Sequence, residues 1–201
     1  MRRLNFMIPG LIAIILQVQA LNLTSLSIVR EREQGTMEQL IVTPIKAWEL
    51  MLGKTLPYVL IVLSNVLVTL AIGVFWFKVA ITGSIPLLMF LSLIFILGSL
   101  GLGILVSNIA KTQMQAMYIS AFIIQTPSMI LSGFVFPRLN MPKVTYFVGN
   151  FLPITYFLEI TRGIILKGAG FFQLWRYIWP LALLSVIFFA LSVITFRKRI
   201  T

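Results

Sequence analysis

The sequence contains no cysteine and no histidine among its 201 residues, and its acidic side chains number only five. Without cysteine it can form neither a disulfide nor a thiolate metal site. Without histidine it cannot build a Ser–His or Cys–His nucleophilic pair. All five acids are glutamates, so the paired-aspartate centre of an intramembrane protease is excluded as well. We therefore expect no catalytic residue and no metal ligand on this chain, and no enzymatic activity of its own.

Charged residues are also scarce. They make up 10% of the sequence, whereas hydrophobic residues make up 59% and the mean hydropathy is +1.02. A soluble domain carries about 25% charged residues, so this composition excludes both a soluble globular protein and a disordered one. The 16 Lys and Arg residues give a net charge of +11. In a membrane protein such an excess reflects loops near anionic headgroups. No segment is long and polar enough to form a nucleic-acid-binding domain.

Apolar runs of about 20 residues, enough to cross a bilayer as a helix, occur five times. They are Ile8–Val29, Leu56–Phe77, Ile85–Ile109, Tyr118–Phe136 and Ile178–Phe196. A sixth apolar region, Val144–Leu166, is interrupted by Gly149 and Pro153, so we expect two short helices that enter and leave on one side. The sequence predicts an all-α integral membrane protein. It has about five transmembrane helices plus a re-entrant helical hairpin before the last span, in a single domain over residues 1–201.

Small and polar residues recur at helical spacing in two of these spans. They are Ser92, Ser99, Gly103 and Ser107 in the third span, and Tyr118, Gln125, Ser128 and Ser132 in the fourth. Each set is expected to share one face, which serves either helix–helix packing or the lining of a substrate path. Both interpretations stay open, and Gln125, Ser128 and Ser132 are the candidate lining residues. Pro127 predicts a kink in the fourth span.

One long polar loop, 30–54, separates the first two spans. Thr36 followed by Gln39 is a capping box, which predicts a short helix beginning at Met37. Thr43-Pro44 predicts a second helix start, because threonine caps well and the missing N–H of proline costs nothing in the first turn. The loop should therefore contain a short helix, a break and a second helix that leads into the membrane.

The short helix carries an apolar face formed by Met37, Leu40 and Ile41. Such a face suits insertion into the groove of a protein partner, and the alternative is a helix that lies on lipid headgroups. A headgroup-binding helix needs Lys or Arg along its polar side, but the only charge on this helix is Glu38. The pattern therefore favours a protein partner.

Gly53-Lys54-Thr55 has the form of the end of a phosphate-binding loop. That pattern requires a glycine at the position of Trp48, and it requires a strand before it rather than a helix. We therefore expect no ATP site on this chain.

Two stretches of the sequence carry distinct motifs. The first reads Glu31-Arg32-Glu33-x-Gly35-Thr36-x-Glu38-x-Leu40-x-x-Thr43-Pro44, then Glu49 and Gly53-Lys54. The second reads Ser132-Gly133-Phe134-x-Phe136-Pro137, Met141-Pro142, Leu152-Pro153-x-Thr155-Tyr156-Phe157 and Glu159-x-x-Arg162-Gly163. The first resembles the cytoplasmic segment, and the second the external re-entrant region, of type-2 ABC exporter permeases, most closely those of the bacterial multidrug type. The resemblance covers nearly the whole chain.

The resemblance implies a permease subunit of an ATP-driven exporter of amphipathic or hydrophobic substrates in the bacterial inner membrane. A separate ATPase subunit would hold ATP and Mg, and a second permease copy would complete the pathway as a dimer in the lipid bilayer. The residues implied to dock on the ATPase are Glu31, Glu33, Gly35, Thr36, Met37, Glu38, Leu40, Ile41, Thr43 and Pro44. The residues implied to form an external gate, within region 137–177, are Pro153, Tyr156, Glu159 and Arg162.

The resemblance also sets the orientation. The 16 Lys and Arg residues divide equally between the two sides, so the positive-inside rule gives no answer. The resemblance places the 30–54 loop in the cytoplasm, and Arg197-Lys198-Arg199 beside the last span favours a cytoplasmic C-terminus. Family members begin with a further span and an external domain, so we expect an N-terminally truncated permease.

Two functions of other classes remain as alternatives. An ATP-independent secondary transporter or channel needs a buried ionisable relay, and Glu159 is the only acid in an apolar setting. One glutamate close to Arg162 favours a structural pair over a relay. The other alternative is a non-functional permease fragment.

Overall fold

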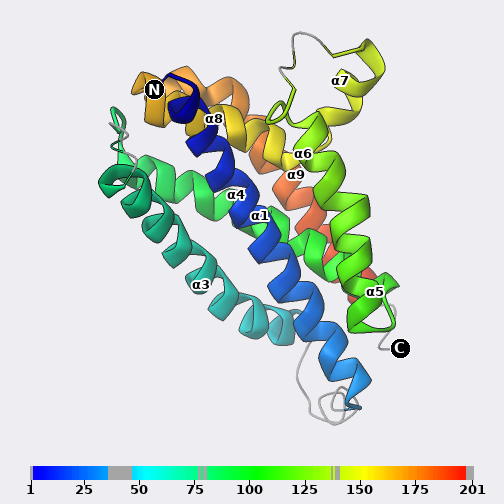
Figure 1. Ribbon diagram of the computed structural model, residues 1–201. Coiled ribbons are helices and arrows are strands. Elements are labelled where there is room, and N and C mark those ends of the chain that lie inside the picture. The colour runs from blue at the N-terminus through cyan, green and yellow to red at the C-terminus, as the bar shows by residue number, and fades with distance from the viewer. Residues whose placement is uncertain are drawn as a thin grey trace.

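The structure, a computed structural model, describes residues 2–35, 47–76, 78, 81–136, 138 and 141–197. These residues form helices and short connections, with no strand among them (Figure 1). The helices are α1 (Arg2–Glu33), α3 (Ala47–Phe75), α4 (Ile85–Ile109), α5 (Gln113–Tyr118), the π-helix η1 (Ile119–Gln125), α6 (Thr126–Leu131), α7 (Lys143–Gly149), α8 (Pro153–Lys167) and α9 (Phe171–Arg197). The helix predicted to begin at Met37 lies outside the described residues.

Five stretches of described helix are long and apolar enough to cross a membrane. They are Met7–Glu33, Gly53–Phe75, Ile85–Ile109, Gln113–Leu131 and Phe171–Thr195. Each overlaps one of the expected spans, and the two shorter helices α7 and α8 fall between the fourth span and the last. The predicted fold class is therefore confirmed. In Figure 1, α6 ends and α9 begins at the end of the bundle where α1 starts, so the α7–α8 pair leaves and returns at that end.

Helix α4 lies at the centre and packs most extensively against α1 and α9. The stripe of small residues on α4 is buried, so it serves helix–helix packing. A Cβ atom added at Gly101 would lie 2.8 Å from the backbone nitrogen of Phe189 on α9. One added at Gly103 would lie 2.8 Å from the carbonyl oxygen of Leu21 on α1. Both neighbours approach so closely because α4 carries no side chain at these positions.

Helix α8 is the most enclosed of the short helices. Phe157 stacks on Phe95 of α4 with ring centroids 4.2 Å apart. Thr161 donates a hydrogen bond from its hydroxyl to the Pro9 carbonyl on α1 (3.3 Å). At the end of α8, the backbone N–H and the hydroxyl of Thr82 both donate to the Ile165 carbonyl. These contacts attach α8 to α1, to α4 and to the turn before α4.

The fourth span is irregular where Pro127 predicts a kink. The irregularity is the π-helix η1, in which the backbone N–H of Thr126 donates to the carbonyl of Ala121, five residues earlier. A π turn takes more residues than an α turn, so side chains before it are rotated relative to those after it. The prediction that Tyr118 shares a face with Ser128 is wrong for this reason: Tyr118 is 58% exposed and Ser128 is 2% exposed.

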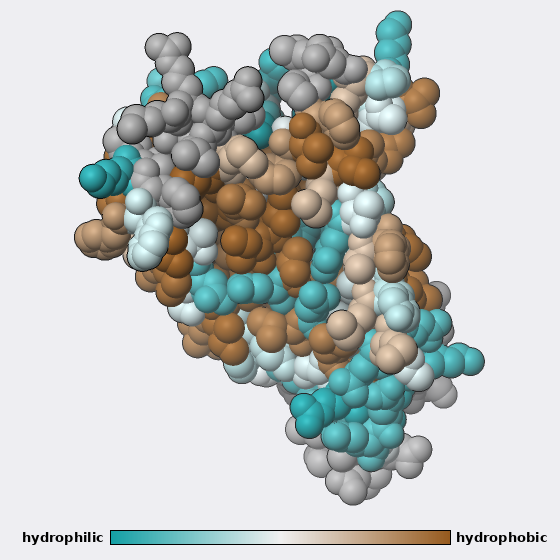
Figure 2. All heavy atoms as spheres, viewed as in Figure 1, coloured by the Kyte–Doolittle hydropathy of each residue, from teal (hydrophilic) through white to brown (hydrophobic). Residues whose placement is uncertain are grey.

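Large apolar side chains cover the outward faces of α3, α5–α6 and α9. Leu60, Phe122 and Trp179 are examples, and each is more than half exposed. Figure 2 shows hydrophobic residues over much of the middle of this face, a band of polar residues that crosses it, and further polar residues gathered where α1 ends and α5 begins. An apolar middle with a polar end is the surface expected of a protein that spans a bilayer.

Candidate functional site

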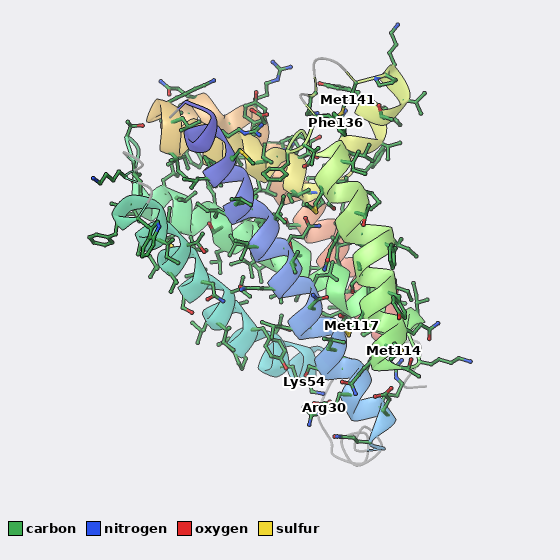
Figure 3. The ribbon with its side chains drawn as sticks, viewed as in Figure 1. Arg30, Lys54, Met114, Met117, Phe136 and Met141 are labelled. Carbon is green, nitrogen blue, oxygen red and sulfur yellow. The ribbon has the colours of Figure 1, made fainter. Side chains whose placement is uncertain are left out.

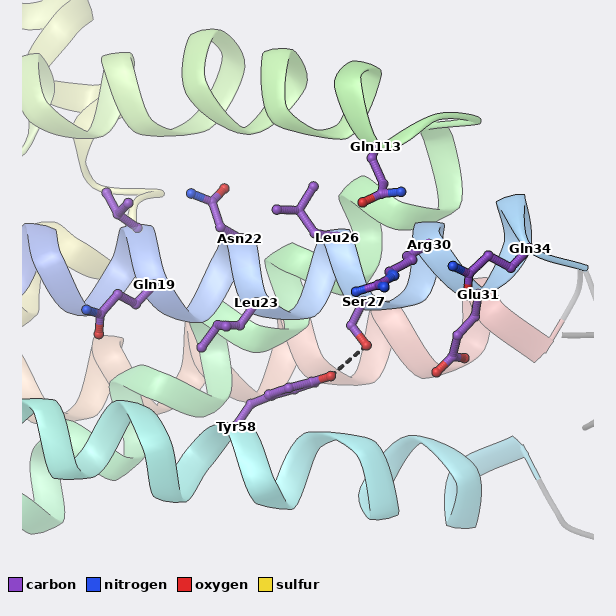
Figure 4. Close-up of a pocket in the computed structure, with 11 residues that line it drawn as sticks. Gln19, Asn22, Leu23, Leu26, Ser27, Arg30, Glu31, Gln34, Tyr58 and Gln113 are labelled. Atoms are coloured by element: carbon purple, nitrogen blue, oxygen red, sulfur yellow. Dashed lines mark hydrogen bonds between the residues drawn. The ribbon is translucent and has the colours of Figure 1, made fainter. Parts of the chain in front are cut away.

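A groove of about 710 Å³ runs along the second half of α1, and we call it the α1 groove (Figure 4). Its apolar lining consists of Val18, Leu23 and Leu26, all on α1. Its polar lining consists of Gln19, Asn22, Ser27, Arg30, Glu31 and Gln34 on or just after α1, Tyr58 on α3 and Gln113 on α5. A surface of this kind offers both apolar contact and hydrogen bonds to an amphipathic molecule.

Several polar residues of α1 reach different neighbouring helices. Asn65 of α3 donates to the side chain of Gln19 (2.7 Å), and Tyr58 of α3 donates to the hydroxyl of Ser27 (2.6 Å). Gln125 of η1 donates to the side chain of Asn22 at 3.4 Å. These hydrogen bonds satisfy polar groups that would otherwise face hydrocarbon, so they tie α3 and η1 to α1 on both sides of the groove.

Three consecutive charged residues at the end of α1, the Glu31–Glu33 triad, bind three other helices. The Glu31 carboxylate pairs with the ammonium group of Lys54 on α3. The Arg32 guanidinium donates to the carbonyls of Ser107 (2.9 Å) and Ala110 (3.2 Å), at the end of α4. The Glu33 carboxylate accepts from the backbone N–H of Gln113 (2.9 Å) and from its side-chain amide (2.5 Å), at the start of α5.

The charges of Arg32 and Glu33 match the ends of the helices that they bind. The last carbonyls of a helix lack intrahelical partners and carry partial negative charge, so they favour the Arg32 cation at the end of α4. The first N–H groups of a helix carry partial positive charge, so they favour the Glu33 anion at the start of α5. Figure 3 shows Arg30 and Lys54 at this end of the bundle, together with Met114 and Met117 of α5.

A second charged cluster lies at the opposite end of the bundle, on α8. Arg162 is 7% exposed, and its guanidinium donates to the carbonyl of Gly133 (3.2 Å). It also pairs with Glu159, with nitrogen and oxygen 3.7 Å apart. The chain turns at Gly133 with φ of +92°, in the left-handed region that favours glycine. The arrangement fixes the turn after α6 against α8.

We expect Arg162→Gln to destabilise the protein more than Glu159→Gln does. Loss of the Glu159 charge removes an ion pair whose acidic partner is one-third exposed, worth about 0.5 to 1 kcal/mol. Loss of the guanidinium also removes the donor to the Gly133 carbonyl, and a buried unsatisfied group costs about 1 to 3 kcal/mol. Thermal unfolding of the two single variants and the double variant measures both effects. Additive effects would show that the two side chains do not interact, and equal effects would show that the Gly133 contact is unimportant.

The match to known proteins decides the family. The family model described as "ABC-2 type transporter" matches residues 2–166. The chain belongs to the ABC-2 type transporter family. This confirms the resemblance drawn from the two motifs.

Curated members of the ABC-2 family extend over much more sequence. "Probable multidrug ABC transporter permease YbhR" of Escherichia coli (strain K12) is 35% identical over 195 residues, 97% of this chain and 53% of the relative. YbhS, which carries the same description, is 38% identical over 164 residues, 82% of this chain and 44% of the relative. "Inner membrane transport permease YhhJ" from that strain is 33% identical over 196 residues, 95% and 52% respectively. The chain spans about half the length of these curated relatives.

The docking residues implied by the resemblance to ABC-2 permeases are only partly described by the structure. The carboxylates of Glu31 and Glu33 bind groups of their own chain. Gly35, with φ of +70°, follows the end of α1 in the left-handed conformation typical of that position. The remaining ones lie outside the described residues: Thr36, Met37, Glu38, Leu40, Ile41, Thr43 and Pro44. Their contact with an ATPase stays a prediction.

The other predicted residues fall in two places in this ABC-2 chain. Pro153 begins α8, and Tyr156 is half-buried against the core, both near the Glu159–Arg162 pair. The predicted pairing of Glu159 with Arg162 is confirmed, while the gating role stays a prediction. Of the candidate lining residues, Ser128 and Ser132 are buried and Gln125 contacts the groove residue Asn22; none of the three lines the α1 groove.

Sequence reasoning did not identify the groove residues of α1. Gln19, Asn22 and Ser27 are polar residues inside an apolar span, and their spacing is close to that of one helix face. Intramembrane polar residues of this kind mark either helix contacts or a substrate path. That signal was available, but the side of α1 that stays open depends on where α3 and α5 lie.

Proposed function

We propose that this chain is the membrane-spanning permease part of an ATP-driven exporter of amphipathic or hydrophobic molecules. In this proposal ATP and Mg are bound by a separate ATPase subunit, and the permease lies in the inner membrane of a bacterium. The observation that carries it is the α1 groove, which lies along a membrane-spanning helix and combines apolar and hydrogen-bonding lining. Membership of the ABC-2 family supports it, and so do the descriptions of YbhR and YhhJ as transport permeases.

The polar end of the groove lies beside the chain that leads into the 36–46 loop, since Arg30, Glu31 and Gln34 line it. Helix α1 ends at Glu33 and α3 begins at Ala47, so this loop directly joins two helices that line the groove. An amphipathic molecule would place its apolar part against Leu23 and Leu26 and its polar part near Arg30, which is exposed. An ATPase that displaces the loop would then move the ends of α1 and α3 and release the molecule.

The outward apolar faces support the remaining partners in the proposal. Fewer than a quarter of the residues of the α3 and α9 spans are buried inside the chain, whereas 61% are buried in the α1 span. A second permease copy and the lipid bilayer would cover these faces. In the proposed orientation the 36–46 loop is cytoplasmic and the α7–α8 pair is external.

The test of this proposal is Leu40→Asp in the permease that carries this chain, expressed with its ATPase. A charge in the predicted apolar face should prevent docking, because an unpaired carboxylate in an apolar contact is costly. We expect the ATPase to be lost from affinity-purified permease, and ATP-dependent uptake of a fluorescent amphiphile into inverted membrane vesicles to stop. Membrane insertion should be unaffected.

Met114→Asp is the matched control, since it also replaces an apolar side chain by a carboxylate, at a residue that is 67% exposed and does not line the groove. It should leave both the ATPase yield and uptake close to those of the unmodified protein. Recovery of the ATPase at full yield with Leu40→Asp would show that the docking surface lies elsewhere.

A further inference from the structure

We infer that the Glu31–Glu33 triad is an intramolecular coupling clamp. It binds the end of α1 to α3, to the end of α4 and to the start of α5, so that a displacement of the 36–46 loop moves these helix ends as one body. The inference rests on the proposed function, in which an ATPase acts on that loop. It differs from the docking role implied by the resemblance, because the charges of Glu31 and Glu33 are directed at their own chain.

The clamp follows from the geometry of a helix end. Consecutive residues of an α-helix point about 100° apart, so three in a row can contact three different neighbours. Glu31 pairs with Lys54 of α3, Arg32 binds the carbonyls that end α4, and Glu33 binds the N–H that begins α5. The chain after Glu33 leads directly into the 36–46 loop. The clamp therefore lies where a force on that loop would first reach the membrane helices.

Arg32 and Glu33 connect the turn between α4 and α5 to the end of α1. The turn has its own cap, since the Thr112 hydroxyl accepts from the backbone N–H of Gln115 (3.2 Å). Arg32 and Glu33 bind on either side of that cap, one to each helix end. The turn therefore has to follow the end of α1 when that end moves.

The clamp also forms the polar end of the α1 groove. Glu31 and Gln113 both line the groove, and both belong to clamp contacts. Movement of the end of α1 is therefore transmitted to α3 and α5, which border the groove on its two sides. Docking at the loop and the position of the polar end of the groove are linked through these three side chains.

The two kinds of contact in the clamp predict different responses to charge exchange. The contact between Glu31 and Lys54 is between two side chains, so exchanging the two residues keeps an ion pair. Arg32 and Glu33 bind backbone groups at helix ends of fixed polarity, so exchanging them places an anion on carbonyls and a cation on an N–H. A device that merely needs charge near the membrane surface would tolerate both exchanges.

The experiment uses the permease assembled with its ATPase. We expect Arg32→Gln to retain the ATPase at the unmodified yield and to reduce ATP-dependent uptake about tenfold, equivalent to a loss of about 1.4 kcal/mol of coupling. The exchange Glu31→Lys with Lys54→Glu should restore uptake lost in either single variant. The exchange Arg32→Glu with Glu33→Arg should not. Lys111→Gln is the control, since it removes an exposed charge from the same turn.

A distance measurement reports the clamp without any transport. This part of the permease has no native cysteine, so cysteines introduced at Gln34 and Met114, both exposed, are the only labelling sites within it. Their distance distribution should be narrow and unchanged by ATP in the otherwise unmodified complex. It should broaden with Glu33→Ala, because this variant loses the two hydrogen bonds that hold the start of α5 to the end of α1.

Each result bears on one proposal. Full uptake in Arg32→Gln would overturn the clamp, and so would a narrow distance distribution in Glu33→Ala or full uptake in the Arg32/Glu33 exchange. Loss of the ATPase from these variants would also overturn it, since the triad would then be part of the docking surface. Absence of ATP-dependent uptake in the unmodified complex would instead overturn the proposed function, while the distance measurement would still test whether the triad holds α5 to α1.

Discussion

Gly101→Ala is expected to prevent stable assembly of the helix bundle. The added Cβ would lie 2.8 Å from the backbone nitrogen of Phe189 and 2.9 Å from the carbonyl carbon of Phe188. Both atoms belong to the α9 main chain, so no side-chain rotation can relieve the overlap. Relief requires α9 to move away from α4, which separates the most extensive helix–helix contact of the described chain. Overpacking of a tight contact costs about 1 to 3 kcal/mol and occasionally more, and a main-chain collision belongs above that range because no side-chain rotation relieves it.

The matched control for this substitution is Gly53→Ala on α3. A Cβ at Gly53 meets nothing within 4 Å, and alanine favours a helix over glycine by about 0.8 to 1 kcal/mol. Size-exclusion profiles and thermal unfolding in detergent should show loss of monodisperse protein for Gly101→Ala and unchanged or slightly raised stability for Gly53→Ala. Equal behaviour of the two variants would show that α4 and α9 do not approach as closely as described.

Phe157→Ala is expected to produce the second largest effect, a loss of about 3 kcal/mol of folding free energy. Phe157 and Phe95 are fully buried and stacked at 4.2 Å, so the smaller side chain would leave a cavity between α8 and α4. Removal of a buried phenylalanine costs about 3 to 5 kcal/mol in soluble cores. The lower value applies here because lipid offers less contrast with an apolar interior than water does.

Two further substitutions test whether the effect comes from the buried ring stack rather than from loss of an apolar side chain. Phe157→Leu fills most of the space and should cost less than half as much. Phe147→Ala on α7 removes the same ring from a position that is 63% exposed, and it should leave the unfolding temperature unchanged. Unfolding of all three followed by tryptophan fluorescence provides the comparison. A Phe157→Ala protein as stable as Phe147→Ala would show that the stack does not hold α8 in place.

Hydropathy and length were sufficient to predict the spans, because hydrocarbon thickness fixes how many apolar residues a spanning helix needs. The interrupted Val144–Leu166 region also predicted two short helices, since α7 ends at Gly149 and α8 begins at Pro153. Signals of this kind depend on a few neighbouring residues. They can therefore be recognised in the sequence even when the helix packing is unknown.

The groove and the clamp could not be predicted in the same way. The contact of Arg32 with Ser107 joins residues that are 75 positions apart, and nothing local to either residue indicates it. The prediction that Tyr118 and Ser128 share one face of the fourth span was wrong for a related reason. One π turn before Pro127 rotates Tyr118 away from Ser128, and the helical spacing used for the prediction assumes 3.6 residues per turn throughout.

The close fit of α4 to α9 has a consequence for the order in which the protein is made. Helix α9 is the last described helix to leave the ribosome, and the glycine positions of α4 that face it, Gly98 and Gly101, remain uncovered until then. Membrane insertion of α1 to α8 therefore yields an intermediate with a small-residue notch open to lipid. Synthesis of α9 closes that notch, so the tight contact between α4 and α9 is the last of the described helix–helix contacts to form.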